Sequence, residues 1–328
     1  MSEKLDPKEV ARVCRDMDLV RKEISKAVVG QELVINGLLR ALLANGHVLV
    51  EGVPGIAKTL IIKTLANVMT SNFQRVQFTS DLLPTDILGL TAYDKTKGFY
   101  IVRGPVFTNF LLADEINRSP GKTQSALLEA MQEKQVTIGR ETFTLEKPFF
   151  VLATMNPIET IATYPLPEAQ IDRFLFKLYI GYPNKKEEQD ILKKNMTTKG
   201  FEDFNIRGVV SSKEILHMQE MCKKVFVNDE VESYIIRIVD ATRYPDKYKL
   251  KLGKYIAWGS SPRASIGLYI GAKAEALLNG KSFVTPQHVK DVAHDVLRHR
   301  VILNYEGQAE NIKQNDIVTE ILAKVPTP

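Results

Sequence analysis

The segment EGVPGIAKT, residues 51–59, places two glycines shortly before Lys58 and Thr59. Backbone N–H groups at the start of a helix bind phosphate oxygens, and a lysine there neutralises the phosphate charge. A threonine directly after that lysine supplies the hydroxyl that such loops use to hold Mg²⁺. The segment therefore predicts a nucleotide phosphate site. The binding residues we expect are Gly52, Val53, Pro54, Gly55, Ile56, Ala57, Lys58, Thr59 and Leu60.

Ala57 occupies the position before the lysine, where the usual loop has glycine. We expect Ala57 to lie where the chain is already entering the helix. A residue with negative φ tolerates a methyl group, so this departure is acceptable if φ of Ala57 is negative. Taken alone, the segment leaves two alternatives open, a nucleotide site and a turn of similar sequence.

Two acidic residues, Asp114 and Glu115, end a second apolar segment, NFLLADEINR. One carboxylate can hold Mg²⁺ through water, and the next can orient or deprotonate an attacking water. Phosphoryl transfer to water requires both roles, so the pair favours a nucleotide site over a simple turn. A third segment, VLATMNP, ends at Asn156, whose neutral amide can position the water without adding charge. The alternative for Asn156 is a turn cap before Pro157.

Arg173 and Arg263 are two further candidates for catalysis. The segment PEAQIDRFLF puts Arg173 at the junction of a short helix and a strand, and GSSPRASIGL puts Arg263 in the first turn of a helix. A guanidinium near the γ-phosphate stabilises the charge that develops there and can raise the rate by about 10³–10⁵. An isolated arginine is more often a solvated surface residue, which is the alternative for each.

Short apolar strands alternate with helical stretches through residues 1–183, a pattern typical of a parallel α/β sheet. Residues 184–328 have apolar side chains at i, i+3, i+4 and i+7 and predict a helical second domain, with a short strand or hairpin within 252–262. Two segments with β-prone arms around a turn predict inserted hairpins, at 88–107 and 134–148. Strands are expected at 47–52, 75–78, 109–114, 149–154 and 173–180, and a helix at 59–70.

The composition limits the classes of protein to consider. The net charge of the 328-residue chain is +5, which is weak for a dedicated nucleic-acid-binding protein. Cys14 and Cys222 are the two cysteines and predict free thiols in a reducing compartment. The N-terminus lacks a signal-peptide apolar core and no apolar stretch is long and uninterrupted, so we expect a cytoplasmic protein without a membrane span. The histidines show no metal-ligand spacing, and His294 and His299 are expected on a surface helix.

Taken in order, several segments resemble the MoxR family of AAA+ ATPases. They are VVGQ at 28–31, EGVPGIAKT, LLADEINRSPGKTQSALLEAMQEKQVTIG, FFVLATMNPIE, YPLPEAQIDRF and SPRA. These segments cover most of residues 28–181 and reappear at 262–264. Any one of them is unspecific, whereas the ordered series is specific. The resemblance implies a P-loop NTPase fold of the AAA+ type: a three-layer core with a parallel sheet and two inserted β-hairpins, followed by an all-helical lid domain.

The resemblance also implies ATP and Mg²⁺ as cofactors and a role for each polar candidate. Lys58 would bind phosphate, and Thr59 and Asp114 would hold Mg²⁺. Glu115 would activate the attacking water, and Asn156 would be the first sensor of the γ-phosphate. These roles are carried over from the family's motifs onto the matching positions of this sequence.

Residues of the resemblance that lie outside the phosphate loop complete the expected site. Residues 28–31, with Val29 and Gly30 among them, would line the adenine side. Arg173 matches the arginine finger that reaches the ATP of a neighbouring subunit, and Arg118 is a rival for that role. Arg263 matches the second sensor. Whether Arg263 acts within or between subunits stays open.

The family implies a homo-oligomer, a hexameric ring with one ATP site at each interface and with the two hairpins directed toward the central pore. Its members resemble chaperone-like remodellers that mature protein complexes or help insert metals, often with a von Willebrand factor A-domain partner. One alternative is a nucleic-acid-dependent ATPase motor, supported only by a sequence pI of about 8.9. Another is a nucleotide-gated binding platform that hardly turns over. The sequence does not name the protein substrate or the partner.

Overall fold

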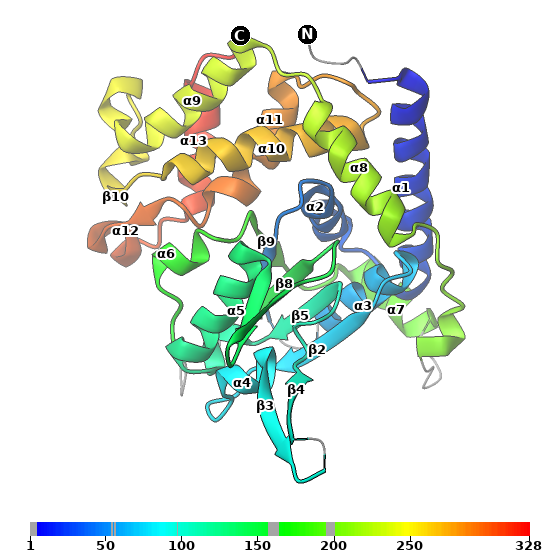
Figure 1. Cartoon of the computed structure of the whole chain (residues 1–328). Coiled ribbons are helices and arrows are strands. Elements are labelled where there is room, and N and C mark those ends of the chain that lie inside the picture. Colours follow the sequence, from blue (N-terminus) through cyan, green and yellow to red (C-terminus); the bar gives the residue numbers. More distant parts are fainter. Residues whose placement is uncertain (1–4, 54, 56, 97, 157–163, 195–200) are drawn as a thin grey trace.

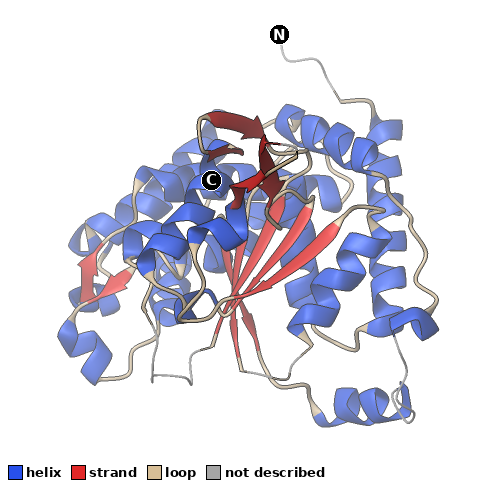
Figure 2. Ribbon diagram, turned by 60° about the horizontal axis from the view of Figure 1, so that its bottom comes forward, coloured by secondary structure: helices blue, strands red, loops and turns tan. Residues whose placement is uncertain are grey.

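The computed structural model describes residues 5–53, 55, 57–96, 98–156, 164–194 and 201–328. Its centre is a five-stranded sheet in the order β2-β5-β8-β1-β9, with every neighbouring pair parallel. Helices cover this sheet on both faces, as Figure 2 shows, so the core has three layers. The strands are β1 (Val48–Gly52), β2 (Phe73–Gln77), β5 (Phe110–Asp114), β8 (Phe150–Met155) and β9 (Phe176–Ile180).

The five predicted strands are confirmed, with small shifts at their ends. Their continuous apolar sequences reflect burial on both faces, since all five residues of β5 are buried. The largest shift is at β9, which begins at Phe176 rather than at residue 173. Residues 172–175 instead form a turn before the strand, and this turn carries Arg173.

Alternate residues of each strand face two different clusters of buried side chains, as the period of two in a strand requires. Val48 and Val50 of β1 belong to the cluster that contains α1, α2 and α3, whereas Leu49 belongs to the cluster under α4 and α5. The helices of this half are α1 (Pro7–Ala27), α2 (Glu32–Leu43), α3 (Lys58–Val68), α4 (Pro84–Leu88), η1 (Ile116–Arg118), α5 (Gly121–Glu133) and α6 (Glu168–Ile171).

Both predicted hairpins are present. The first pairs β3 (Gly89–Asp94) with β4 (Gly98–Arg103), and the second pairs β6 (Gln135–Ile138) with β7 (Glu141–Thr144). The β3–β4 hairpin extends away from the body of the molecule at the bottom of Figure 1. Tyr93 and Phe99 pair across its two strands and are exposed, which leaves aromatic rings on its surface.

The rest of the chain is mainly helical, as expected, with one small strand pair formed by β10 (Ile256–Trp258) and β11 (Ile302–Leu303). None of the helices in the described ranges is long and apolar enough to cross a membrane. The helices are α7 (Lys185–Lys194), η2 (Phe201–Phe204), α8 (Ser212–Lys224), α9 (Asp229–Arg243), η3 (Pro245–Tyr248), η4 (Leu252–Tyr255), α10 (Pro262–Leu278), α11 (Pro286–Leu297), α12 (Tyr305–Ala309) and α13 (Gln314–Lys324).

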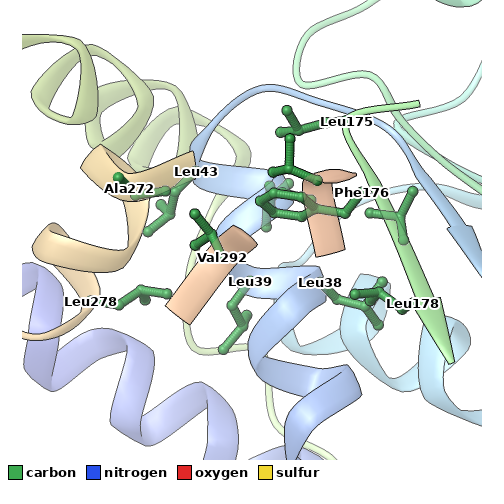
Figure 3. Close-up of a cluster of buried hydrophobic side chains, with 14 of the residues drawn as sticks. Leu38, Leu39, Leu43, Leu175, Phe176, Leu178, Ala272, Leu278 and Val292 are labelled. Atoms are coloured by element: carbon green, nitrogen blue, oxygen red, sulfur yellow. The ribbon is translucent and has the colours of Figure 1, made fainter. Parts of the chain in front are cut away.

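The C-terminal helices and the sheet share one apolar core. Figure 3 shows side chains of α2, of the β9 region and of α10 and α11 packed together. Phe176 of β9 is fully buried, and a Cβ added to Gly271 of α10 would lie 3.1 Å from its ring. Close packing of this kind transmits displacement, so the start of β9 and the helices α10 and α11 are mechanically linked.

Candidate nucleotide site

A cavity of about 600 Å³ lies at the carboxyl edge of the sheet, where β1, β2 and β5 end. Its polar lining joins the two predicted motifs, since Lys58 and Thr59 at the start of α3 face the same space as Asp114 and Glu115 at the end of β5. The structure therefore brings the phosphate loop and the acidic pair together. The lining residues are Ala27, Val28, Val29, Gln31, Gly55, Ala57, Lys58, Thr59, Leu60, Arg75, Gln77, Asp114, Glu115, Pro183 and Ile191.

The phosphate loop runs directly from the buried strand β1 into α3. Gly55 has φ +81°, a left-handed conformation that glycine adopts without strain, and a side chain there would meet nothing within 4 Å. Lys58 is the first residue of α3, and its Nζ donates a hydrogen bond to the Gly52 carbonyl at 2.6 Å. The lysine thus closes the loop across its base. The predicted residues Pro54 and Ile56 lie outside the described part of the chain, and Val53 packs against the apolar core.

The expected backbone conformation of Ala57 was wrong, because its φ is +59° rather than negative. Ala57 precedes the helix as its N-cap, and its carbonyl accepts the first helical bond from the Ile61 N–H at 2.9 Å. Ala57 therefore still belongs to the turn before α3, whose first residue is Lys58. A Cβ in left-handed backbone costs about 1 kcal/mol, which the surrounding loop must offset.

The acidic pair is held by the hydroxyl of Thr154, a fully buried residue of the neighbouring strand β8. This hydroxyl donates to Asp114 Oδ1 at 2.6 Å and accepts from the Glu115 N–H at 2.8 Å. Glu115 has φ +56°, an uncommon conformation that turns the chain sharply after β5. Strained backbone of this kind gathers at functional sites, and here it directs consecutive carboxylates into one cavity.

Side chains from β2 contact both carboxylates. Arg75 Nη2 lies 2.7 Å from Asp114 Oδ2 and 2.9 Å from Gln77 Oε1. Gln77 Nε2 in turn donates to Glu115 Oε2 at 2.6 Å. Arg118 Nη1 donates to the same oxygen at 3.0 Å. The acidic pair therefore sits in a hydrogen-bonded network rather than facing solvent alone.

Sequence reasoning missed Arg75, Gln77 and Thr154. The segment RVQF, residues 75–78, was interpreted only as a strand, although β2 and β5 end at the same edge. In the observed register Gln77 is opposite Asp114, so a polar residue ending β2 was the available signal. Thr154 had a similar signal, because it is a polar residue within an otherwise apolar buried strand.

The far end of the cavity is apolar. Val28, Val29, Pro183 and Ile191 line it, which suits the flat apolar face of a nucleotide base. Gln31 Nε2 donates to the Gly181 carbonyl at 3.0 Å and ties this segment to the end of β9. Gly30, predicted to bind the cofactor, is not among the lining residues; a Cβ there would lie 2.4 Å from Glu187 Oε1.

Asn156 follows β8 at the carboxyl edge and is buried, with 4% of its surface exposed. The predicted location between a γ-phosphate and the acidic pair requires the amide to face the cavity. Asn156 is not among the residues that line it. Asn156 thus follows the strand that pairs with β5, but it is not one of the residues that line the cavity.

Arg173 and Arg263 lie far from the phosphate loop, at the amino edge of the sheet. Both are exposed, and both line a second cavity of about 320 Å³. Arg173 precedes β9 and Arg263 is in the first turn of α10, as predicted. Lys134, at the end of α5, lines the same cavity, and its burial lowers its pKa. Arg300 also lines this cavity, so the structure gathers four cations at the edge opposite the phosphate loop.

Two buried histidines stabilise this amino edge. His47 accepts from the Val151 N–H at Nδ1 and pairs with the Met131 carbonyl at Nε2, each at 3.1 Å. Its full burial lowers its pKa to about 4. The surface position expected for His299 was wrong: it lies beyond the end of α11, is buried, and contacts the Phe174 carbonyl at 3.1 Å. Desolvation holds its pKa well below the usual range.

The fold and the carboxyl-edge cavity define an AAA-type ATPase. Residues 47–176 match the family described as ATPases associated with various cellular activities (AAA), and residues 252–321 match an AAA lid domain. Among solved structures, a protein from Cytophaga hutchinsonii has a TM-score of 0.91 at 46% sequence identity, covering 98% of this chain and 97% of that chain.

Two relatives identify the family more closely. The chain is 45% identical over 308 residues to Chaperone MoxR1 of Mycobacterium tuberculosis, covering 93% of this chain and 81% of the relative. It is 42% identical over 308 residues to the uncharacterized protein YeaC of Bacillus subtilis, covering 94% and 93%. The chain belongs to the MoxR family of AAA+ ATPases, and its activity is the hydrolysis of ATP.

Proposed function

We propose that this protein hydrolyses ATP with Mg²⁺ in the carboxyl-edge cavity and uses the energy for chaperone-like remodelling of protein complexes. One observation supports the site above all others: Lys58, Thr59, Asp114 and Glu115 line one cavity although they come from two separate segments. The apolar end of that cavity has room for a base, and its polar end has the donors and carboxylates that a triphosphate with a hard cation requires.

The metal would be held by oxygen ligands, from the Thr59 hydroxyl directly and from Asp114 through water. Oxygen donors at one end of the cavity fit Mg²⁺, which neutralises phosphate charge when bound. Lys58 binds the β- and γ-phosphates, so its contact with Gly52 exchanges for phosphate oxygens. Glu115 then accepts a proton from the attacking water, while Thr154 fixes the direction of its backbone.

The amino edge of one subunit would complete the carboxyl edge of the next. Arg173 and Arg263 are exposed at the edge opposite the phosphate loop, so neither faces the cavity of its own subunit. Their side chains are available to a neighbour's triphosphate, which supports a homo-oligomeric ring, a hexamer by family. Arg118 contacts Glu115 within its own subunit at 3.0 Å. This contact favours Arg173 over Arg118 as the intersubunit arginine. The exposed position of Arg263 at the same edge as Arg173 supports an intersubunit role for Arg263 as well.

Residues 1–183 would form the nucleotide-binding core and residues 184–328 the helical linker and lid. The exposed aromatic rings of the β3–β4 hairpin suit contact with a protein substrate near the ring's pore. A relative's name, Chaperone MoxR1, supports the remodelling role. A von Willebrand factor A-domain protein is the partner we propose by family. The two cysteines, both free thiols, are compatible with work in the cytoplasm.

The test of this function is phosphate release by the purified, assembled protein. Glu115→Gln should bind ATP with unchanged affinity and release almost no phosphate, because only the acceptor of the water's proton is lost. Lys58→Ala should lose both ATP affinity and turnover. Glu230→Gln, at an exposed carboxylate in the first turn of α9 and outside both the phosphate cavity and the cavity that Arg173 and Arg263 line, is the control and should retain activity. Unchanged phosphate release by both Glu115→Gln and Lys58→Ala would contradict the assignment.

A further inference from the structure

Arg300 is a buried arginine beside the turn that precedes β9, with 6% of its surface exposed. Its guanidinium donates to the backbone carbonyls of Asp172 at 3.2 Å, Phe174 at 2.7 Å and Leu175 at 3.1 Å. A further bond reaches the Val296 carbonyl of α11 at 2.5 Å. Burial of a guanidinium is costly unless its donors are satisfied in fixed directions. Here those directions define the path of the main chain on both sides of residue 173.

Asp172 extends the same network to the start of α10. One carboxylate oxygen accepts from Arg300 Nε at 2.7 Å, and the other accepts from the Ser261 hydroxyl at 2.9 Å. Ser261 is the N-cap of α10, and its hydroxyl also accepts from the Arg263 N–H at 3.2 Å. The Asp172 carboxylate thus connects the turn that contains Arg173 to the start of α10, which contains Arg263.

The consequence is a fixed spacing between the two exposed arginines. Arg173 lies between Asp172 and Phe174, both of which Arg300 holds, and Arg263 lies two residues after Ser261. Neither arginine takes part in the network through its side chain, so both guanidinium groups stay available. Five directional bonds from one buried group hold the frame from which they project.

We propose that Arg300 and Asp172 are positioning residues that hold Arg173 and Arg263 as one unit for the triphosphate of the neighbouring subunit. This inference rests on the proposed intersubunit role of the two arginines. The unit also links turnover to the lid, since a displacement of the start of α10 passes through Ser261 and Asp172 to Arg173. Arg300 itself is buried, and the hydrogen bonds of its guanidinium go to this turn and to α11.

A purely structural role for the network predicts loss of stability without a specific loss of turnover. Asp172→Asn separates these alternatives, because the amide keeps the size of the side chain but weakens the charged bond to Arg300. Glu275→Gln is the matched control: Glu275 is a buried acid of α10 that pairs with Arg40, about 18 Å along the helix from Arg263. We expect kcat of Asp172→Asn to fall about 10²-fold, the typical effect of a misplacement of about 1 Å.

The KM for ATP of Asp172→Asn should not change, because each subunit would bind ATP through its own carboxyl edge, and the oligomeric state should not change either. Glu275→Gln should lower the melting temperature to a similar extent and leave kcat near its original value. Wild-type kcat in Asp172→Asn would overturn the inference. So would a failure of this variant to assemble, since the network would then serve the subunit's structure rather than the placement of its arginines.

Mixed oligomers give the decisive readout. Subunits with Lys58→Ala have intact arginines and an inactive phosphate loop, so they should restore phosphate release when mixed with Asp172→Asn subunits. A defect confined to the folding of Asp172→Asn subunits would not be rescued this way. Arg173→Ala mixed with Lys58→Ala runs in parallel. Rescue of Arg173→Ala but not of Asp172→Asn would overturn the positioning role alone. Rescue of neither would overturn the proposed intersubunit site and this inference with it.

Discussion

The two edges of the central sheet differ in how they are built. At the carboxyl edge, each polar group lies in a strand or shortly after it, since Asp114 ends β5 and Lys58 comes after the short loop from β1. At the amino edge, the cavity with Arg173 and Arg263 is assembled from segments around residues 45–47, 131–134, 172–175, 263–270 and 300. The first edge needs only the register of a parallel sheet. The second needs the C-terminal helices to be packed against that sheet.

In our proposal the two edges have different roles in ATP hydrolysis. The carboxyl edge would hold the nucleotide of its own subunit, so changes there should alter ATP affinity, as at Lys58, or the chemical step, as at Glu115. The amino edge has no contact with its own subunit's phosphate cavity, so changes there should alter turnover and leave affinity unchanged. Substitutions at matched positions of the two edges can therefore break or sharpen the comparison.

The largest effect is expected from Arg173→Ala. Loss of a guanidinium that stabilises the charge developing on the γ-phosphate should lower kcat of the assembled protein by about 10³–10⁵. ATP affinity measured on dilute subunits should stay unchanged, because Arg173 does not line the nucleotide cavity. Equilibrium binding and single-turnover phosphate release measure the two quantities. A loss of ATP affinity in dilute Arg173→Ala subunits would show that Arg173 contacts the nucleotide of its own subunit. The proposed difference between the two edges would then be wrong.

A smaller effect is expected at the carboxyl edge from Thr154→Val. The hydroxyl of Thr154 binds Asp114 and orients the Glu115 backbone, so its loss should displace both carboxylates and lower kcat by about 10²-fold. It also leaves the Glu115 N–H without this acceptor, which should cost about 1–3 kcal/mol of stability. Thr154→Ser keeps the hydroxyl and is the control. Equal kcat in the Val and Ser variants would show that Thr154 only fills space.

The amino edge should respond to pH through His47. The unfolded chain binds a proton at His47 below about pH 6.5, whereas burial keeps the native side chain neutral down to about pH 4. The free energy of unfolding should therefore be unaffected by His47 above pH 6.5 and should fall as pH decreases below it. Between pH 7 and pH 5 we expect a loss of about 2 kcal/mol from this residue.

His47→Gln keeps a donor and an acceptor for Met131 and Val151 without a group that titrates. Denaturant unfolding of both proteins at several pH values isolates the contribution of His47. In His47→Gln, the free energy of unfolding should no longer include the loss of about 2 kcal/mol between pH 7 and pH 5 that His47 causes. An identical pH dependence of stability in the two proteins would rule out a neutral, buried His47.

The smallest expected effect concerns the phosphate loop itself. Because φ of Ala57 is +59°, Ala57→Gly should relieve the left-handed strain and raise the free energy of unfolding by about 0.5–1 kcal/mol. At a negative φ the same substitution would instead destabilise the protein, since glycine loses more backbone entropy on folding. Chemical denaturation decides the sign. If Ala57→Gly is less stable than the wild type, Ala57 has a negative φ, as the sequence suggested.

Features of the carboxyl edge could largely be predicted from the sequence, whereas features of the amino edge largely could not. The strands, both hairpins and the meeting of Lys58 with Asp114 could be predicted, because each depends on local apolar runs and on the rule that parallel strands end together. The contacts of Arg75 and Gln77 depend on which strands are neighbours and on their register. The network around Arg300 joins residues 128 positions apart and has no local signal. The backbone of Ala57 differed from expectation because Ala57 is the cap residue before α3 and not part of the helix, and the local sequence does not give the sign of φ at such a cap.

The central claim is that the amino edge of one subunit completes the carboxyl edge of the next. Mixing Arg173→Ala subunits with Lys58→Ala subunits and following phosphate release tests it most directly. Each variant alone should be nearly inactive, and the mixture should regain turnover where an intact phosphate loop meets an intact arginine. Mixtures that stay as inactive as their parts at every ratio would contradict the claim.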